Sequence, residues 1–232
     1  MNSDQYEKQY TEFKKRSKTD GRFSIEEGDK QAQLTEDTEN FSYDSHYMYH
    51  TAWAARKLSA NKPKKHVDVS SYIYFSTIVS AFVPVEFLDY RPLGISLHNL
   101  RSGKADLTHL DREDNSIDSL SCMHVIEHVG LGRYGDSLDP HGDKVAAGEL
   151  KRVLAPGGSL YIVLPVAASG RVCFNAHRVY SFRMVQELFD GLHLKSNALL
   201  SDKGTVFIED ATEDVYSQQH YGCGCFEFLK VA

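Results

Sequence analysis

The chain has 232 residues, 41% of them hydrophobic and 25% charged, a composition typical of a soluble globular protein. Its net charge of -6 argues against a nucleic-acid-binding protein, which needs a basic face, and no apolar run reaches the roughly 20 residues of a membrane helix. The N-terminus has no apolar signal-peptide region, and four cysteines are too few for a disulfide framework, which predicts a cytoplasmic protein without membrane partners.

Residues 1–62 are predicted to form an N-terminal extension that is partly helical and partly acidic. Tyr6, Tyr10 and Phe13 have the spacing of one face of a short helix. Residues 24–40 are acidic and poor in apolar side chains, which is typical of a solvated linker.

A second helix is predicted from about Ser45 to Ser59, and Asn61 and Pro63 end it. One face of this helix collects Tyr47, Thr51, Ala54, Ala55 and Leu58. The aromatic residues of segment 41–60 suit either a helix packed on the core or a helix that covers a pocket. Core packing is the favoured interpretation, because aromatic side chains serve cores so often.

Residues 63–232 alternate between strand and helix patterns and are predicted to form one α/β domain. Strands are predicted at His66–Val69, 85–89, 104–107, 117–126, 160–166, 192–200 and 224–231, with helices at 75–82, 145–154 and 182–189. This alternation predicts a doubly wound, mostly parallel sheet. The wholly apolar run at 160–166 suits a parallel strand covered on both faces.

The segment from Ser116 to Asp143 combines an apolar strand with a glycine-rich loop that carries many ionisable side chains. Enzymes of the α/β class present their sites in this way, at the carboxyl ends of the strands. The sequence therefore predicts the functional site at this edge of the sheet.

Residues 64–231 resemble the class I S-adenosylmethionine-dependent methyltransferases, and most closely their type-eleven group. The resemblance rests on acid-ended first and second strands, on the EHV of 127–129 and on ELKRVLAPGGSLYIVLP at 149–165. The runs GLGRYGD at 130–136 and FNAHRVYS at 174–181 are similar to an uncharacterised domain-of-unknown-function subgroup, often associated with surface-glycan synthesis. The resemblance implies a Rossmann-like fold, S-adenosyl-L-methionine as cofactor and a small-molecule acceptor.

The resemblance also implies which residues contact the cofactor. Asp89 at the end of the second strand would accept the ribose hydroxyls, as acidic residues do in dinucleotide folds. Asp106 would accept the adenine amino group, and Asp68 would lie near the methionine part. The alternative for Asp89 is a turn residue before Arg-Pro, and for Asp106 an Asx cap. The complete predicted cofactor set is Asp68, Ser70, Ser71, Asp89, Asp106 and Leu107.

The first turn departs from the family pattern D-x-G-x-G-x-G, whose glycines let the backbone approach the cofactor. Here the turn runs from Asp68 to Tyr74 without a glycine. Ser70 and Ser71 are small enough for a tight turn, but Tyr72 is not small. Either the cofactor lies differently in this protein or it does not bind, and the second case would leave a non-catalytic binding protein with this fold.

A zinc-protease pattern, H-x-x-E-H, is present as His124, Glu127 and His128. It requires one helix to carry both histidines, whereas the neighbouring turn and Gly130 favour a strand end here. No residue is therefore assigned to a metal, and a metal-dependent hydrolase is the least favoured alternative.

Methyl transfer to a hydroxyl needs a base and a positioned acceptor. His128 and His177 are candidate bases, because histidine titrates near neutrality, and Glu127 would border the reacting centre. Arg133, Asp139 and Arg178 are the predicted acceptor-binding residues, although loop-ordering salt bridges would explain them equally well. We expect a sugar or nucleotide-sugar acceptor of glycan biosynthesis. No oligomeric state is predicted.

Overall fold

The computed structural model describes residues 1–17, 25–39 and 42–231. Ser24, Asn40 and Phe41, which belong to the predicted linker and aromatic segment, lie outside the described residues. The chain divides into two compact units, residues 1–43 and residues 44–232. Within the described ranges, no helix combines the length and the apolar character that crossing a bilayer requires.

The first unit contains helix α1 (Ser3–Ser17) and a 3-10 turn, η1 (Glu27–Asp29). Helix α1 confirms the helix predicted from the spacing of its aromatic residues. Lys30 holds the unit together, because its Nζ lies 2.8 Å from Glu7 Oε2 and 4.2 Å from the centre of the Tyr10 ring.

The second unit is built on an eight-stranded sheet with the order β3-β2-β1-β4-β5-β10-β8-β9. Its strands are β1 (His66–Val69), β2 (Val85–Asp89), β3 (Leu100–Lys104), β4 (Ile117–Met123), β5 (Leu154–Val166), β8 (His193–Leu200), β9 (Phe207–Glu209) and β10 (Gly222–Leu229). Strands β1 to β5 pair in parallel. Strand β10 lies antiparallel between β5 and β8. The doubly wound, mostly parallel sheet is thus confirmed.

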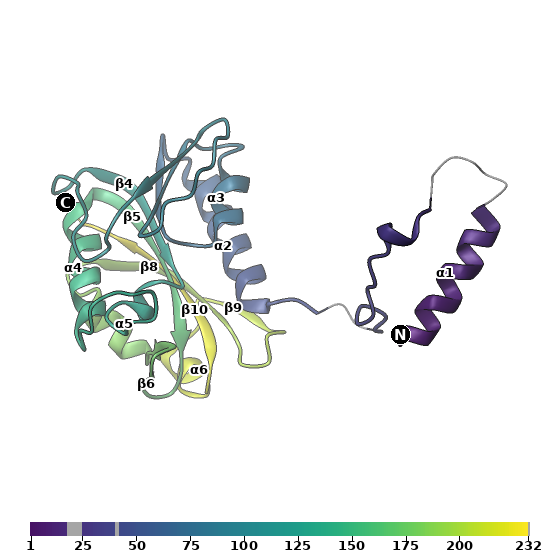
Figure 1. The fold of residues 1–232 in the computed structure, drawn as a ribbon. Helices are drawn as coiled ribbons and strands as arrows, with labels where there is room; N and C mark the ends of the chain where they lie inside the picture. Colours follow the sequence, from purple (N-terminus) through teal and green to yellow (C-terminus); the bar gives the residue numbers. More distant parts are fainter. Residues whose placement is uncertain (18–24, 40–41, 232) are drawn as a thin grey trace. The chain divides into compact units, whose positions relative to one another are not determined.

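Helices cover both faces of this sheet (Figure 1). One face packs against α2 (Ser45–Asn61) and α3 (Ile73–Val79), through Trp53, Leu58 and Phe75 among others. The other face packs against α4 (Gly142–Val153), α5 (Phe182–Leu188) and α6 (Glu213–Ser217). The result is a three-layer arrangement with two buried apolar clusters, one on each side of the sheet.

Helix α2 forms where it was predicted and belongs to the second unit. Asp44 caps its N-terminus by accepting a hydrogen bond from Tyr47 N, and Lys62 ends it in the left-handed conformation. The extension was predicted to span residues 1–62 and the α/β domain residues 63–232. In the structure the two compact units divide between Tyr43 and Asp44.

The predicted third strand, 104–107, is wrong in position, because the strand runs from Leu100 to Lys104. This strand lies at the edge of the sheet and contains one buried apolar residue, Leu100, so it lacks the alternation that marks a strand. A small hairpin of β6 (Arg171–Cys173) and β7 (His177–Val179) was not predicted. Both of its strands have only three residues.

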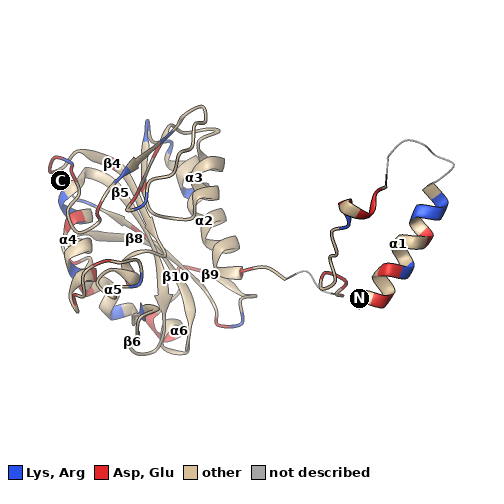
Figure 2. Ribbon diagram, viewed as in Figure 1, with Lys and Arg blue, Asp and Glu red and all other residues tan. Residues whose placement is uncertain are grey.

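Acidic and basic side chains are interspersed along the described part of the chain (Figure 2).

One buried carboxylate, that of Glu227, connects α2, β8 and β10. Glu227 of β10 is 1% exposed, and its carboxylate accepts hydrogen bonds from Asn61 of α2 (2.8 Å) and Lys195 of β8 (2.8 Å). Ser196 also donates to it, at 2.9 Å. Burial alone would raise the pKa of Glu227, but these donors lower it below its ordinary value.

We expect Glu227→Ala to lower the free energy of unfolding by about 2–3 kcal/mol, because it leaves several donors unpaired. The folded-state pKa lies below the ordinary value of 4.5. The stabilisation by Glu227 is therefore complete above that pH and is lost as the pH falls through the folded-state pKa. Urea unfolding of both proteins at neutral and acid pH measures this difference. Glu187→Ala, which removes an exposed pair with Arg183, is the control and should change stability little.

Candidate active site

The turn between β1 and α3 contains a serine in a glycine-like conformation. Ser70 has a φ of 56°, in the left-handed region that favours glycine. Its backbone N–H donates to Leu88 O at 2.7 Å, and its hydroxyl donates to the same oxygen at 3.1 Å. Ser71 Oγ accepts from Met123 N at 2.9 Å, which ties the turn to the end of β4. The serines thus build the tight turn that glycines would otherwise supply.

Beneath this turn lies a buried hydrogen-bond chain centred on Asp68, which is 0% exposed. One carboxylate oxygen of Asp68 accepts from Ser121 Oγ at 2.6 Å and the other accepts from Ser76 Oγ. Since Ser121 donates to Asp68, it must accept from His66 Nε2, which lies 2.9 Å away. His66 Nδ1 in turn accepts from Ser119 Oγ, at 2.8 Å. The chain joins β1, β4 and α3.

Burial shifts both ionisable groups of this chain toward their neutral forms. It raises the pKa of Asp68 to about 6, against the opposing hydrogen bonds from the serines, and it lowers the pKa of His66 to about 3. Asp68 lines neither of the two cavities described below, so its predicted contact with a cofactor finds no support in this placement. Its position is that of a support for the turn.

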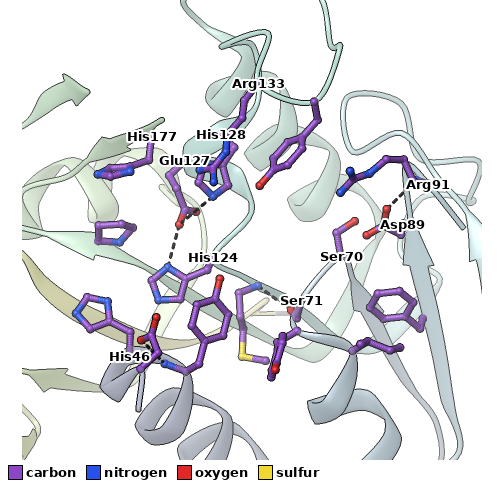
Figure 3. A pocket seen from close by; sticks show the side chains of 18 of the residues that line it. His46, Ser70, Ser71, Asp89, Arg91, His124, Glu127, His128, Arg133 and His177 are labelled. Carbon is purple, nitrogen blue, oxygen red and sulfur yellow. Dashed lines mark hydrogen bonds and ion pairs between the residues drawn. The ribbon is translucent and has the colours of Figure 1, made fainter. Parts of the chain in front are cut away.

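Two cavities adjoin at the carboxyl ends of the parallel strands. The central cavity has a volume of about 910 Å³ and the adjoining cavity about 500 Å³. Both volumes lie in the range of small-molecule sites. Ser70, Asp89 and His128 line both cavities. Figure 3 shows Ser70, Asp89 and Arg91 on one side of the central cavity, opposite Glu127, His128 and His177.

The predicted cofactor residues are distributed over the two cavities. Ser71 lines the central cavity, whereas Asp106 and Leu107 line the adjoining one. Asp89 Oδ1 accepts from Arg91 N at 2.7 Å. Asp106 Oδ1 accepts from Thr108 N at 2.8 Å, so both residues do form the Asx turns that the alternative interpretation expected. Each nevertheless presents its side chain to a cavity.

The segment after β4 does not form the helix on which the zinc-protease pattern depends. His124 follows the strand with a φ of 56°, and Glu127 and His128 lie in a 3-10 turn, η2 (Ile126–His128). His124 Nδ1 donates to Glu127 Oε1 at 2.9 Å. Burial alone would lower the pKa of His124, but Cys223 and Glu127, which contact its two ring nitrogens, raise it.

Glu127 is 1% exposed and lines the central cavity. Its Oε1 lies 3.9 Å from His128 Nε2, and its Oε2 has no hydrogen-bond partner within the described residues. An unpaired buried carboxylate oxygen is costly in free energy, and it commonly marks a functional site.

His128 is held in one tautomer. Its Nδ1 lies 2.6 Å from Ala176 O, and a carbonyl oxygen can only accept, so Nδ1 carries the proton. Burial lowers the pKa of His128 below its ordinary value, which favours the neutral ring at pH 7. Neutral His128 therefore has a free lone pair on Nε2, as a general base requires.

The loop from Val129 to His141 is ordered from within. Asp136 Oδ2 accepts from Gly130 N at 2.7 Å and from Gly132 N at 3.3 Å. Gly130 has a φ of 82°, and a Cβ at this position would collide with Asp139 O. The glycines of the GLGRYGD run are thus required by the backbone.

Arg178 anchors the backbone of this loop through hydrogen bonds. It is 6% exposed and donates to Val129 O at 2.6 Å and to Asp139 O at 3.2 Å. It lines neither cavity, so its predicted contact with an acceptor finds no support in this placement. Asp139 lines the adjoining cavity, on the side of Asp106.

Arg133 and His177 line the central cavity, and their assignment to the acceptor stays a prediction. Arg133 donates to Ala176 O at 2.9 Å. Asp136, an acidic residue of the same loop, accepts backbone N–H groups from Gly130 and Tyr134. Arg91 and Tyr134 also line this cavity, with the Arg91 guanidinium 4.9 Å from the centre of the Tyr134 ring.

The first turn of α2 was not predicted as part of the site. His46 and Tyr47 line the central cavity, while Trp53 and Leu58 of the same helix lie in the core. Both interpretations of this aromatic segment therefore apply, to different parts of one helix. The presence of two polar aromatic side chains, His46 and Tyr47, directly after the capping Asp44 is the signal that could have indicated the cavity wall.

Comparisons with known proteins bear on the fold. Residues 105–214 match a family described as "Caenorhabditis protein of unknown function, DUF268". No curated protein sequence matches the chain. Solved structures that are similar include a putative sarcosine dimethylglycine methyltransferase from Galdieria sulphuraria. It has 14% identity, a TM-score of 0.57, and coverage of 79% of this chain and 86% of that one.

Two further similar structures have bound S-adenosylhomocysteine. The N-methyltransferase NodS from Bradyrhizobium japonicum is 14% identical, with a TM-score of 0.56 and coverage of 79% of this chain and 86% of its own. The 1,6-didemethyltoxoflavin-N1-methyltransferase from Burkholderia thailandensis is 12% identical, with a TM-score of 0.56 and coverage of 100% and 92%. The chain therefore has the fold of the class I S-adenosylmethionine-dependent methyltransferases.

The raised pKa of Asp68 predicts a pH-dependent effect of Asp68→Asn. Its folded-state value of about 6 lies above the ordinary 3.8. Protonation of Asp68 therefore favours the folded state, and this contribution is lost as the pH rises through about 6. Relative to the unaltered protein, Asp68→Asn should gain about 1.4 kcal/mol of stability between about pH 5 and pH 8. Urea unfolding at both pH values measures the gain, and a difference that does not change with pH would contradict it.

Proposed function

We propose that the chain is an S-adenosylmethionine-dependent methyltransferase whose acceptor is a sugar or nucleotide-sugar hydroxyl of glycan biosynthesis. One observation carries the proposal. Asp89, a carboxylate at the end of β2, and His128, a neutral imidazole with a free lone pair, line the same cavity. A residue suited to the cofactor and a residue suited to the acceptor thus share one space, on a fold that similar structures use to bind S-adenosylhomocysteine.

The cavity walls offer polar groups of the kinds that the cofactor would need. Asp89 uses Oδ1 for its turn, and within the described residues Oδ2 has no hydrogen bond and is free to accept from ribose. Asp106 and Leu107 in the adjoining cavity would hold the adenine ring. Ser70 and Ser71 would contact the methionine part, with Asp68 supporting them from beneath. When bound, S-adenosylmethionine supplies an electrophilic methyl group.

The remaining wall of the central cavity suits a polar acceptor. His128 Nε2 would take the proton of the acceptor hydroxyl, and the Glu127 carboxylate, 3.9 Å away, would stabilise the imidazolium that forms. Arg133 and His177 would bind and orient the acceptor. Arg178 would act through the loop, by holding its backbone in place.

A second candidate function is ligand binding without methyl transfer. Tyr72 favours it, because this residue stands at a glycine position of the family pattern and lines the central cavity. Its ring packs edge-on against Tyr47, with the ring centres 5.1 Å apart. Product formation from S-adenosylmethionine separates the two candidates.

We propose the cytoplasm as the compartment of this reaction. All four cysteines are among the described residues, and each is free. Unpaired thiols, three of them buried, suit a reducing compartment.

Isothermal titration calorimetry with S-adenosylmethionine and S-adenosylhomocysteine tests the cofactor assignment. Both ligands should bind, and Asp89→Ala should weaken each by at least about 10-fold, because charge-assisted hydrogen bonds to ribose are lost. The matched control is Asp118→Ala, an exposed aspartate near the opposite end of the sheet in β4. The absence of heat with both ligands would refute the cofactor, and unchanged affinity in Asp89→Ala would refute the ribose assignment.

His128→Ala should slow methyl transfer by about 10²- to 10⁴-fold while cofactor affinity stays unchanged. Because the pKa of His128 lies below its ordinary value of 6.5, the rate should fall as the pH is lowered through that pKa and be level above it. Formation of S-adenosylhomocysteine from S-adenosylmethionine, with a series of nucleotide sugars as acceptors, measures the rate. Nitrogen-15 NMR of the histidines independently checks the Nδ1–H tautomer.

A further inference from the structure

Three potential metal ligands converge at the edge of the central cavity. They come from distant parts of the chain: His46 from α2, His124 from the end of β4 and Cys223 from β10. One ligand atom from each residue lies within 4.8 Å of the other two. Of the residues in the H-x-x-E-H pattern, only His124 is a ligand in this set.

The spacing of these atoms is close to that around a tetrahedral zinc ion. His124 Nε2 and Cys223 Sγ are 3.5 Å apart. A zinc ion with bonds of about 2.3 Å to sulfur and about 2.0 Å to nitrogen, at tetrahedral angles, requires a separation of roughly 3.5 Å. His46 is half-buried, and its ring stacks on that of His124 with the ring centres 5.6 Å apart, so the His46 ring would have to reorient to complete the third bond.

Glu127 orients the central ligand. Its Oε1 accepts from His124 Nδ1 at 2.9 Å, which turns Nε2 toward Cys223. Zinc-binding histidines usually donate their second ring N–H to a carboxylate in this way. The other oxygen, Oε2, is buried and has no hydrogen-bond partner within the described residues.

A second unpartnered atom lies in the same region. His50 is 0% exposed, and its Nδ1 donates to His46 O at 2.6 Å. Its Nε2 is buried without a hydrogen-bond partner in the described part of the chain, and its ring centre lies 5.0 Å from that of His124. Buried nitrogen and oxygen atoms without partners indicate that a ligand is expected here.

We propose that His46, His124 and Cys223 bind a zinc ion, with Glu127 as the positioning carboxylate. Two imidazoles and one thiolate suit this borderline-soft ion, and Cys223 would lose its thiol proton on binding. Three protein ligands leave the fourth position open, as in catalytic zinc sites. The cluster borders the central cavity, which both His46 and His124 line. The proposal does not depend on methyl transfer.

The test uses full-length protein without a polyhistidine tag, stripped of metal and titrated with Zn²⁺ and with Co²⁺. We expect one equivalent of each to bind, and Co²⁺ to show thiolate charge-transfer absorption and the intense visible bands of tetrahedral coordination. Cys223→Ser should abolish the thiolate absorption, and His46→Ala should weaken Zn²⁺ binding by at least about 10-fold. Glu127→Gln should weaken it by about 10- to 100-fold.

Cys173→Ser and His98→Ala are the matched controls, since both residues lie outside the cluster and neither is buried. Both variants should bind Zn²⁺ as the unaltered protein does. Circular dichroism and thermal unfolding of the metal-free proteins separate lost ligands from lost folding. Absence of stoichiometric binding, or binding that survives Cys223→Ser combined with His46→Ala in a folded protein, would overturn the proposal.

Discussion

The site depends on the buried hydrogen-bond chain from Ser119 through His66 and Ser121 to Asp68. In glycine-rich turns of this kind, the absence of side chains lets the backbone bend beneath the ligand. Here the turn instead contains Ser70 in a left-handed conformation, and a carboxylate under it connects β1 to β4 and α3. Burying the ionisable carboxylate of Asp68 beneath the turn costs free energy. This cost is consistent with a functional role for the turn.

The antiparallel strand β10 gives the site a second set of residues. It lies between β5 and β8, and its first residues reach the edge of the central cavity. Helix α2 approaches the same edge from one face of the sheet and contributes His46 and Tyr47. A parallel α/β core thus provides one side of the central cavity, while a helix that precedes the core and a strand that ends it complete the other side.

Much of this fold was predictable because buried parallel strands are nearly continuous apolar runs, and three of them end in or beside an acidic residue or a histidine. The edge strand β3 was misplaced because Leu100 is its one buried apolar side chain. The cavity-lining positions of Ser71, Asp89 and His128 were predictable, because each residue lies at or shortly after the end of a strand. The burial of Asp68 and Arg178 was not predictable, because it depends on hydrogen bonds to hydroxyl and carbonyl groups that are distant in the sequence. The contact between Cys223 and His124 was not predictable either, because it depends on the order of the strands in the sheet.

The close packing of Gly130 against the Asp139 carbonyl has a consequence for how this protein can diversify. The base of the loop admits no side chain, and Arg178 fixes the carbonyls on both sides of it. Substitutions that alter ligand preference are therefore confined to the tip, where Arg133 and Tyr134 are exposed. Related sequences with different ligands should retain Gly130 and Arg178 and vary at Arg133 and Tyr134.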